Sequence, residues 1–121
     1  MIPLDRGTFC DWLDTYERAW ETGEADAVAA LFDPGATYAP TPFGEPLRGR
    51  DAIRRYWLET TTGQTAASVT AAVVAVGRDH GVAHVTASFV RDGSSVDVDG
   101  MLSARFLAGD CVELREWPHT R

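Results

Sequence analysis

The sequence predicts an α+β fold in which three helices are followed by a curved antiparallel sheet. In the first half of the chain, apolar residues recur three and four positions apart, which is the spacing of amphipathic helices. From about residue 66 onward they alternate with polar residues, which is the pattern of strands. A run of helices before a run of strands is typical of α+β domains. A sheet that covers three apolar helical faces must curl, so we expect the helices to pack in its concave face.

Length and composition indicate one globular domain over residues 1–121. Hydrophobic residues make up 45% of the chain and charged residues 24%, enough for one sizeable core. The 11 basic residues, all Arg, are outnumbered by 18 acidic ones, for a net charge of −7. We therefore expect neither nucleic acid nor a membrane as partner, because phosphate neutralisation needs clustered basic residues. The sequence also has neither a secretory-signal pattern nor the roughly 20 apolar residues of a membrane span, so the cytoplasm is the expected compartment.

The cysteines and histidines do not indicate a metal site. Cys10 and Cys111 lie near opposite ends of the chain, and we expect both to be buried free thiols. His80, His84 and His119 do not follow the spacing of zinc ligands. The sequence therefore predicts no metal and no cofactor.

The first predicted helix covers Thr8–Trp20, and one side of it is apolar: Phe9, Trp12, Leu13, Tyr16, Ala19 and Trp20. Thr8 and Asp11 resemble a capping box, and Gly23 is expected to end the helix. A shorter second helix is predicted to bury Ala25, Val28, Ala29, Leu31 and Phe32 and to end at the turn 33–35. A third helix is predicted from Gly49 or Arg50 until the run 60–63, with one apolar face formed by Ile53, Tyr56 and Trp57.

A brief strand is expected over Ala36–Ala39, and four longer ones are predicted over Ala67–Val76, Val82–Val90, Val96–Leu107 and Cys111–Trp117. The segments 78–81, 91–94 and 108–110 have the composition of hairpin turns. Gly100 is expected to form a bulge or a bend within the third of these four long strands.

A proline-rich loop, PTPFGEP, covers residues 40–46. Proline restricts φ and donates no backbone hydrogen bond, so the loop is expected to be stiff and to lie outside the sheet interior. Two interpretations of Phe43 remain open. It either lines the rim of a cavity or plugs the open end of the fold.

Three segments, AWETGEADAVAALFDPGATY, PFGEPLRGRDAIRRYW and CVELREW, resemble the SnoaL-like branch of the nuclear transport factor 2-like superfamily. The resemblance extends from about residue 9 to residue 117. It implies a cystatin-like cone whose pocket lies between the curved sheet and the helices, a small-molecule partner, and often a homodimer. Members include polyketide cyclases, ketosteroid isomerases, epoxide hydrolases, dehydratases and noncatalytic proteins.

The catalytic residues of the ketosteroid isomerases are only partly matched. Those enzymes use a tyrosine donor, a carboxylate base and a protonated aspartate. The resemblance places Tyr16 at the donor position, but the base position falls on Pro40 and the aspartate position near Leu102. Isomerisation of steroids is therefore not expected.

The resemblance to SnoaL-like cyclases is better in the last strand, where it places Glu116 at the position of the catalytic aspartate. Alternation supports this placement, since Val112, Leu114 and Glu116 share one face of the strand and the first two are apolar. A carboxylate at the end of an apolar face is expected to have a raised pKa, as acid-base catalysis near neutral pH requires. In the alternative interpretation, Glu116 lies in water at the strand end or pairs with an arginine.

The expected catalytic residues are thus Glu116 as the acid-base group and Tyr16 as a hydrogen-bond donor to a developing oxyanion. The expected substrate-binding residues are Trp12, Trp20, Tyr38, Phe43, Tyr56, Trp57, Leu102 and Leu114. Packing in the core is the alternative role for Tyr16 and for the tryptophans.

The opposite faces of the strands are expected to form the convex side of the sheet. His84, Asp97 and Asp99 are predicted there, although a bulge at Gly100 would turn Asp99 inward. A mixed polar and aromatic surface is expected from Met101, Ser103, Arg105, Arg115 and Trp117. Such a surface suits a homodimer interface, because Trp and Arg are favoured at interfaces.

The function predicted from these features is proton transfer on an apolar or carbonyl-bearing small molecule by a cofactor-independent cyclase, isomerase or dehydratase. The alternative is a noncatalytic ligand-binding or dimeric accessory domain, with the cavity largely filled by aromatic side chains. An epoxide-hydrolase-like enzyme would need an Asp-Arg-Asp group in the cavity, which the sequence does not place.

Overall fold

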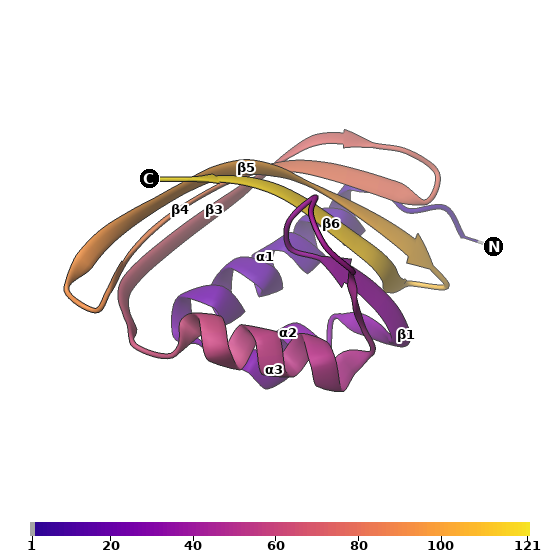
Figure 1. Cartoon of the computed structure of the whole chain (residues 1–121). Coiled ribbons are helices and arrows are strands. Elements are labelled where there is room, and N and C mark those ends of the chain that lie inside the picture. Colours follow the sequence, from indigo (N-terminus) through magenta and orange to yellow (C-terminus); the bar gives the residue numbers. More distant parts are fainter. Residues whose placement is uncertain (1) are drawn as a thin grey trace.

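A computed structural model of the chain describes residues 2–121. Three helices, α1 (Arg6–Thr22), α2 (Ala25–Ala29) and α3 (Arg50–Thr61), lie on the concave side of a curved sheet (Figure 1). The strands of the sheet are β1 (Phe32–Ala39), β2 (Leu47–Arg48), β3 (Gln64–Val76), β4 (His80–Arg91), β5 (Ser94–Leu107) and β6 (Asp110–Thr120). The fold is α+β, as predicted. However, α3 follows β1 and β2, so the helices do not all precede the strands.

The sheet is mixed, and the prediction of a purely antiparallel sheet is wrong. The strand order is β2-β1-β6-β5-β4-β3, and every described neighbouring pair is antiparallel except β1 and β6. Alternation of apolar residues reports which face of a strand is buried but not the direction of its partner. No hairpin joins β1 to β6, so local sequence does not specify their pairing.

The hairpin turns follow from residues that adopt positive φ. Asp92 and Gly93 join β4 to β5 with φ of 50° and 79°, and Ala108 and Gly109 join β5 to β6 with φ of 53° and 87°. Positive φ at both central residues is the type I′ arrangement, whose twist matches that of the strands. These turns lie where the sequence predicts them.

The helix ends differ in part from the prediction. Asp5, not Thr8, caps α1, since its carboxylate accepts a hydrogen bond of 2.7 Å from the backbone N–H of Thr8. Gly23 ends the helix in the left-handed conformation, as predicted. The second helix is shorter than predicted because Phe32 already begins β1, which pairs with β6.

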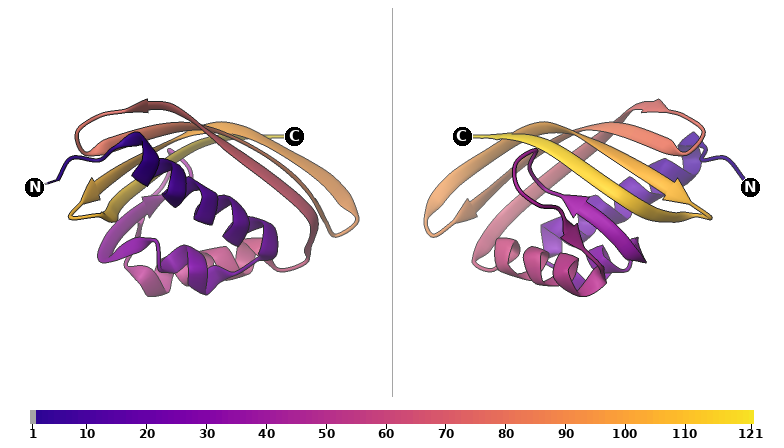
Figure 2. Two further views of the ribbon diagram at one scale, coloured as in Figure 1. Left: turned by 180° about the vertical axis from the view of Figure 1, so that it is seen from behind. Right: turned by 45° about the vertical axis from the view of Figure 1, so that its right-hand side comes forward.

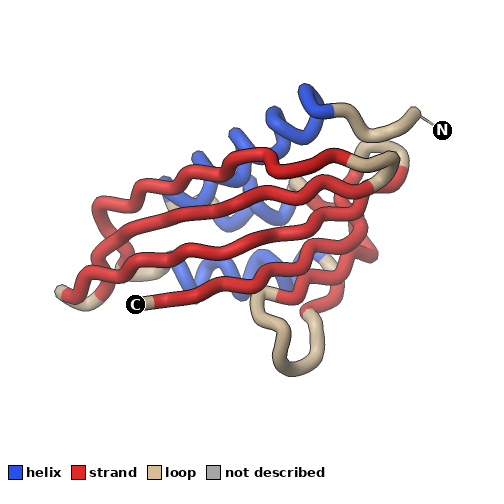
Figure 3. Tube along the Cα trace, turned by 90° about the horizontal axis from the view of Figure 1, so that it is seen from above, coloured by secondary structure: helices blue, strands red, loops and turns tan. Residues whose placement is uncertain are grey.

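The core lies between α1 and the concave face of the sheet. Figures 2 and 3 show all helices on one side of the sheet and none on the other. The buried side of α1 consists of Phe9, Trp12, Leu13, Tyr16 and Ala19, as predicted. The two layers approach closely at Gly81, where an added Cβ would lie 2.5 Å from the ring of Phe9. None of the described helices is long and apolar enough to cross a membrane.

The pairing of β5 continues unbroken past Gly100 on both sides, so the residue forms no bulge. A Cβ there would lie 2.5 Å from the backbone oxygen of Trp117, which makes Gly100 a point of close approach between β5 and β6. The register shift lies instead next to Arg105 and Phe106, where β6 contains the extra residue Val112. Its effect is that Cys111, rather than Val112, shares the buried face with Leu114.

Candidate functional site

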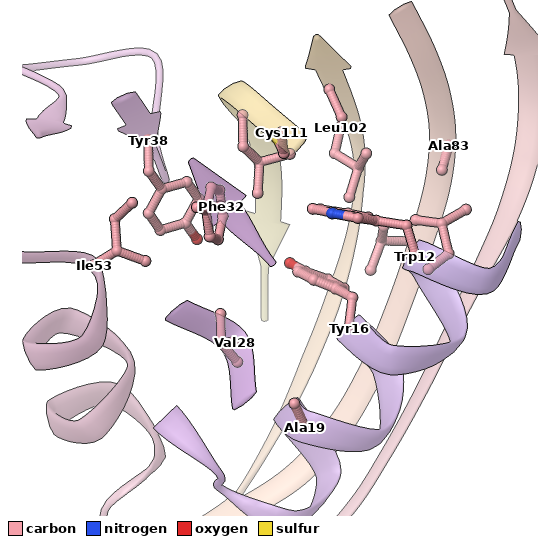
Figure 4. Packing of buried hydrophobic residues seen from close by; sticks show 14 of the residues in the cluster. Trp12, Tyr16, Ala19, Val28, Phe32, Tyr38, Ile53, Ala83, Leu102 and Cys111 are labelled. Atoms are coloured by element: carbon pink, nitrogen blue, oxygen red, sulfur yellow. The ribbon is translucent and has the colours of Figure 1, made fainter. Parts of the chain in front are cut away.

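The candidate site is centred on the carboxylate of Glu116 in β6. The hydroxyl of Tyr16 donates a hydrogen bond to Oε2, and the hydroxyl of Tyr38 donates one to Oε1. Both tyrosines are almost completely buried. Figure 4 shows their side chains extending from α1 and from β1 into the space between the helices and the sheet.

Three separate elements position these groups. Tyr16 belongs to the buried side of α1 and stacks against Trp12, with ring centroids 5.7 Å apart. Tyr38 pairs with Leu114 in the register of β1 and β6, and Glu116 follows two residues later on the same face. The parallel pairing of β1 and β6 therefore places the Tyr38 hydroxyl within reach of the carboxylate.

Burial raises the pKa of Glu116 above its usual value of 4.5, and the two tyrosine hydrogen bonds partly oppose this effect. Burial, together with the nearby charge of Glu116, raises the pKa of Tyr16 and that of Tyr38 well above 10. Both hydroxyls therefore stay protonated at neutral pH and act as donors. A half-buried carboxylate with a raised pKa is suited to exchange protons with a bound molecule.

Glu116 also lines a pocket of about 390 Å³, a volume within the range of small-molecule sites. The lining residues with polar side-chain groups include Tyr38, Tyr56, Trp57 and Arg91. Among the described lining residues, Glu116 is the one carboxylate. The pocket thus has no Asp-Arg-Asp group of the kind that the epoxide-hydrolase interpretation requires.

Four of the predicted substrate-binding residues, Trp20, Tyr38, Tyr56 and Trp57, line this pocket. Tyr16 instead lies beneath Glu116, within the core. Trp12, Leu102 and Leu114 belong to the core cluster and are not among the residues that line this pocket, which for Trp12 agrees with the alternative role in the core. Trp12 packs beneath the sheet, and its indole N–H donates to the backbone oxygen of Leu31 at 3.2 Å.

Phe43 lies outside the fold, with 82% of its surface exposed. Both predicted roles, lining the cavity and plugging it, are therefore wrong. The loop that carries it follows β1, which pairs with β2 over only two residue pairs, Thr37–Arg48 and Tyr38–Leu47. The loop thus projects from the edge strands instead of folding inward. From this loop, Pro40 lines the pocket.

Sequence reasoning missed Phe89 and Arg91, which line the pocket from the end of β4. The sequence pattern of β4 could have indicated both residues, because the alternation that turns Ala83, Val85 and Ala87 inward also applies to Phe89 and then to Arg91. The guanidinium lies 5.4 Å from the centroid of the Phe89 ring.

Three of the residues predicted on the convex side lie on an exposed polar surface, whereas Met101 is among the residues that line the pocket. His84, Asp97 and Asp99 are exposed, and Nε2 of His84 lies 2.7 Å from Oδ1 of Asp99. A more open hollow of about 560 Å³ runs over this polar surface, away from Glu116. Within residues 2–121, no group of three or more His, Cys, Asp or Glu residues is arranged to hold a metal ion. Cys10 and Cys111 are both free thiols.

Two proteins illustrate the similarity of this fold to solved structures. The epoxide hydrolase/cyclase-like enzyme SalBIII, described in pyran ring formation in the polyether salinomycin, is 16% identical and superposes with a TM-score of 0.81 over 95% of this chain and 93% of its own. A hypothetical protein from Catenulispora acidiphila with a ketosteroid isomerase-like fold, in complex with trimethylamine, is 18% identical. It has a TM-score of 0.77 over 88% of this chain and 83% of its own.

At these identities the similarity concerns the fold, a cone of the nuclear transport factor 2-like type. The search of curated proteins found no match. The model of the SnoaL-like domain matches residues 13–114, most of the chain and all of the helical layer except the start of α1. The chain therefore belongs to the SnoaL-like domain family.

Proposed function

We propose that this protein is a cofactor-independent enzyme that transfers a proton on a small carbonyl-bearing molecule, with Glu116 as the acid-base group. The observation that carries the proposal is the arrangement of Glu116. Its carboxylate borders the pocket, has a raised pKa and receives hydrogen bonds from two tyrosines that remain neutral. The first step is the same for an isomerase, a cyclase or a dehydratase that acts on a carbonyl compound, since each begins with removal of a proton next to the carbonyl group.

In the proposed step, ionised Glu116 removes a proton from the carbon next to the carbonyl group. The electron pair of the broken C–H bond forms the enolate double bond, and the negative charge moves to the carbonyl oxygen. Protonated Glu116 no longer needs two hydrogen-bond donors, so one tyrosine hydroxyl becomes free to donate to the new oxyanion. The sequence pointed to Tyr16 for this role. Tyr38 is better placed, because it lines the pocket while Tyr16 lies in the core. Glu116 then returns the proton to the product.

The apolar wall of the pocket supports a largely hydrophobic substrate. Trp20 and Trp57 pack edge to face with centroids 5.4 Å apart, and Tyr56 packs against Tyr38 at 5.5 Å. These rings give the pocket that Glu116 borders an apolar wall, and a less polar surrounding strengthens the interactions of a carboxylate with a bound molecule.

The test is hydrogen exchange into a simple enolisable ketone, 2-tetralone, in deuterated water, followed by proton NMR. We expect the wild-type protein to accelerate exchange at the carbon next to the carbonyl. Glu116→Gln should lower the acceleration by roughly a hundredfold or more. Glu113→Gln is the matched control, because it removes another carboxylate of β6 that does not line the pocket. Exchange that is unchanged by Glu116→Gln would overturn the proposal.

One observation favours a second candidate, a noncatalytic ligand-binding domain. Both oxygens of Glu116 are already hydrogen-bonded within the protein, as expected for a structural buried carboxylate. In that case the wild-type protein binds 2-tetralone, as measured by calorimetry, but does not accelerate exchange.

We also propose that the protein is a homodimer through the convex side of the sheet. Met101 pairs with Trp117, and the Arg115 guanidinium lies 5.0 Å from the centroid of the Trp117 ring. These apolar and cationic groups suit the centre of an interface. Sedimentation should show a dimer for the wild type and dissociation for Trp117→Ser. Leu58→Ser, at an exposed apolar residue of α3, is the control and should remain dimeric. A monomeric wild type would refute this part of the proposal.

A further inference from the structure

The pocket contains a cation without a counter-ion. Arg91 is the one basic residue among the described lining residues, at the end of β4. No carboxylate within residues 2–121 forms an ion pair with it, whereas Arg54 pairs with Asp26 and Arg121 with Asp97. The Nε atom of Arg91 is buried and has no hydrogen-bond partner among the described residues. A guanidinium group carries five donors, and a buried donor without an acceptor is costly.

Arg91 and Glu116 line the same pocket, and no hydrogen bond or ion pair joins them within residues 2–121. Arg91 packs over the ring of Phe89. Burial and the charge of Glu116 raise the pKa of Tyr56, and the charge of Arg91 lowers it. The pocket thus contains one cationic group and one acid-base group that do not pair with each other.

One alternative partner within the protein is Gln64. It is the register partner of Arg91 between β3 and β4, and its Oε1 atom is also buried without a partner. A hydrogen bond between these two side chains would pair one of the five guanidinium donors, but it would leave the positive charge of Arg91 without a counter-ion. The positive charge of Arg91 favours an anionic ligand, even though the chain as a whole has a net charge of −7.

We propose that the pocket takes an amphipathic organic anion, whose carboxylate binds Arg91 while its apolar body lies along the aromatic wall. The placement of the ligand's carbonyl end at Glu116 rests on the function proposed above, but the recognition of the anionic group by Arg91 does not. A planar guanidinium can bind a carboxylate through two parallel hydrogen bonds, which makes Arg91 a residue that determines specificity.

The probes are 4-oxo-4-phenylbutyrate, which carries a ketone and a carboxylate, and its neutral amide. Binding of each is measured by calorimetry at neutral pH and low salt, with four variants. Arg91→Met and Arg91→Gln remove the cation, and Arg91→Lys retains the charge without the planar group. Arg55→Gln removes an exposed arginine of α3 that does not line the pocket, and it serves as the control.

We expect the wild type to bind the acid about tenfold more tightly than the amide, the usual effect of a charge-assisted hydrogen bond. Arg91→Met and Arg91→Gln should bind acid and amide equally, and Arg91→Lys should retain part of the preference. Arg55→Gln should behave as the wild type. Thermal unfolding of each variant verifies that it is folded, and using two neutral substitutions guards against one that fails to fold.

The inference would be overturned if the wild type bound acid and amide with equal affinity, or if it bound neither probe. It would also be overturned if the Arg91 variants lost affinity for acid and amide to the same extent, which would indicate that Arg91 has a packing role. Glu116→Gln separates the two proposals. If the Glu116→Gln variant still prefers the acid to the amide, and if it exchanges 2-tetralone as fast as the wild type, the inference stands and the enzymatic proposal fails. If exchange depends on Glu116 but the acid is not preferred, the reverse holds.

Discussion

Tyr38 and Glu116 are 78 residues apart in the chain, yet the tyrosine hydroxyl donates a hydrogen bond to the carboxylate. They meet because β1 and β6 form the parallel pair of the sheet. Tyr16 reaches the other carboxylate oxygen from α1. A single acidic group is thereby held by donors from both layers of the fold.

Removal of either tyrosine hydroxyl should raise the pKa of Glu116 further, since each bond stabilises the ionised carboxylate. Tyr16→Phe and Tyr38→Phe should each lower the free energy of unfolding at neutral pH by about 1–3 kcal/mol. NMR of the side-chain carboxyl carbons and urea unfolding measure the two effects. Tyr56→Phe is the control, because its hydroxyl does not bond to Glu116. An unchanged pKa in both variants would show that the hydroxyls do not stabilise the charge.

Glu116 should make stability fall as pH rises. Its pKa in the folded protein lies above 4.5, so the folded state holds the proton more tightly than the unfolded state. This contribution is fully present below the unfolded-state pKa and is lost as pH rises through the folded-state pKa. Relative to wild type, Glu116→Gln should therefore gain stability as pH rises from the unfolded-state pKa of Glu116 through its folded-state pKa. Urea unfolding across this range measures the difference, and a difference that is constant with pH contradicts the expectation. Glu113→Gln serves as the control for a carboxylate of β6 outside the pocket.

Gly100 should not tolerate a larger side chain. A Cβ would meet the Trp117 oxygen at 2.5 Å and the Pro118 Cα at 2.8 Å, and both are backbone atoms of β6. Gly100→Ala should therefore cost about 1–3 kcal/mol of unfolding free energy and reduce ligand binding in the adjoining pocket. Gly77→Ala is the control, since its Cβ would make only an ordinary contact of 3.7 Å. Equal stability of the two variants would show that β6 adjusts freely.

The two thiols should differ in reactivity. Burial raises the pKa of Cys111 to about 12, whereas Cys10 is only half-buried. Because the thiolate is the reactive form, a disulfide reagent at pH 8 should leave Cys111 unmodified until the protein unfolds. Mass spectrometry of the native and urea-unfolded Cys10→Ser variant measures this difference. Rapid labelling of that variant in the native state would mean that β6 opens readily.

Much of the fold could be predicted from local patterns. The buried side of α1, its end at Gly23 and the turns at Asp92-Gly93 and Ala108-Gly109 depend on helical periodicity and on positive φ. The start of α1 was predicted less well, because capping by Asp5 depends on one side-chain orientation. The bulge at Val112 was not predicted, because Cys111 and Val112 are both apolar and the sequence does not show which of them shares the buried face with Leu114.

The site could be predicted only in part. Alternation along β6 indicated the inward direction of Glu116, and helical spacing indicated that of Tyr16. Their meeting could not be predicted, because it depends on how α1 crosses the sheet. The position of Phe43 could not be predicted either, since a stiff loop with an aromatic residue has the same sequence pattern whether it folds inward or projects outward.

By itself, the amino-acid sequence determined the helices, the long strands and the faces that they bury, because these depend on residues a few positions apart. Only the tertiary structure decided that β6 lies parallel to β1, that two tyrosines hold Glu116 and that Arg91 shares its pocket with no ion pair to a carboxylate of residues 2–121. These relationships join residues from distant segments, and they form only when the sheet curves around the helices and brings the strands' inner faces together.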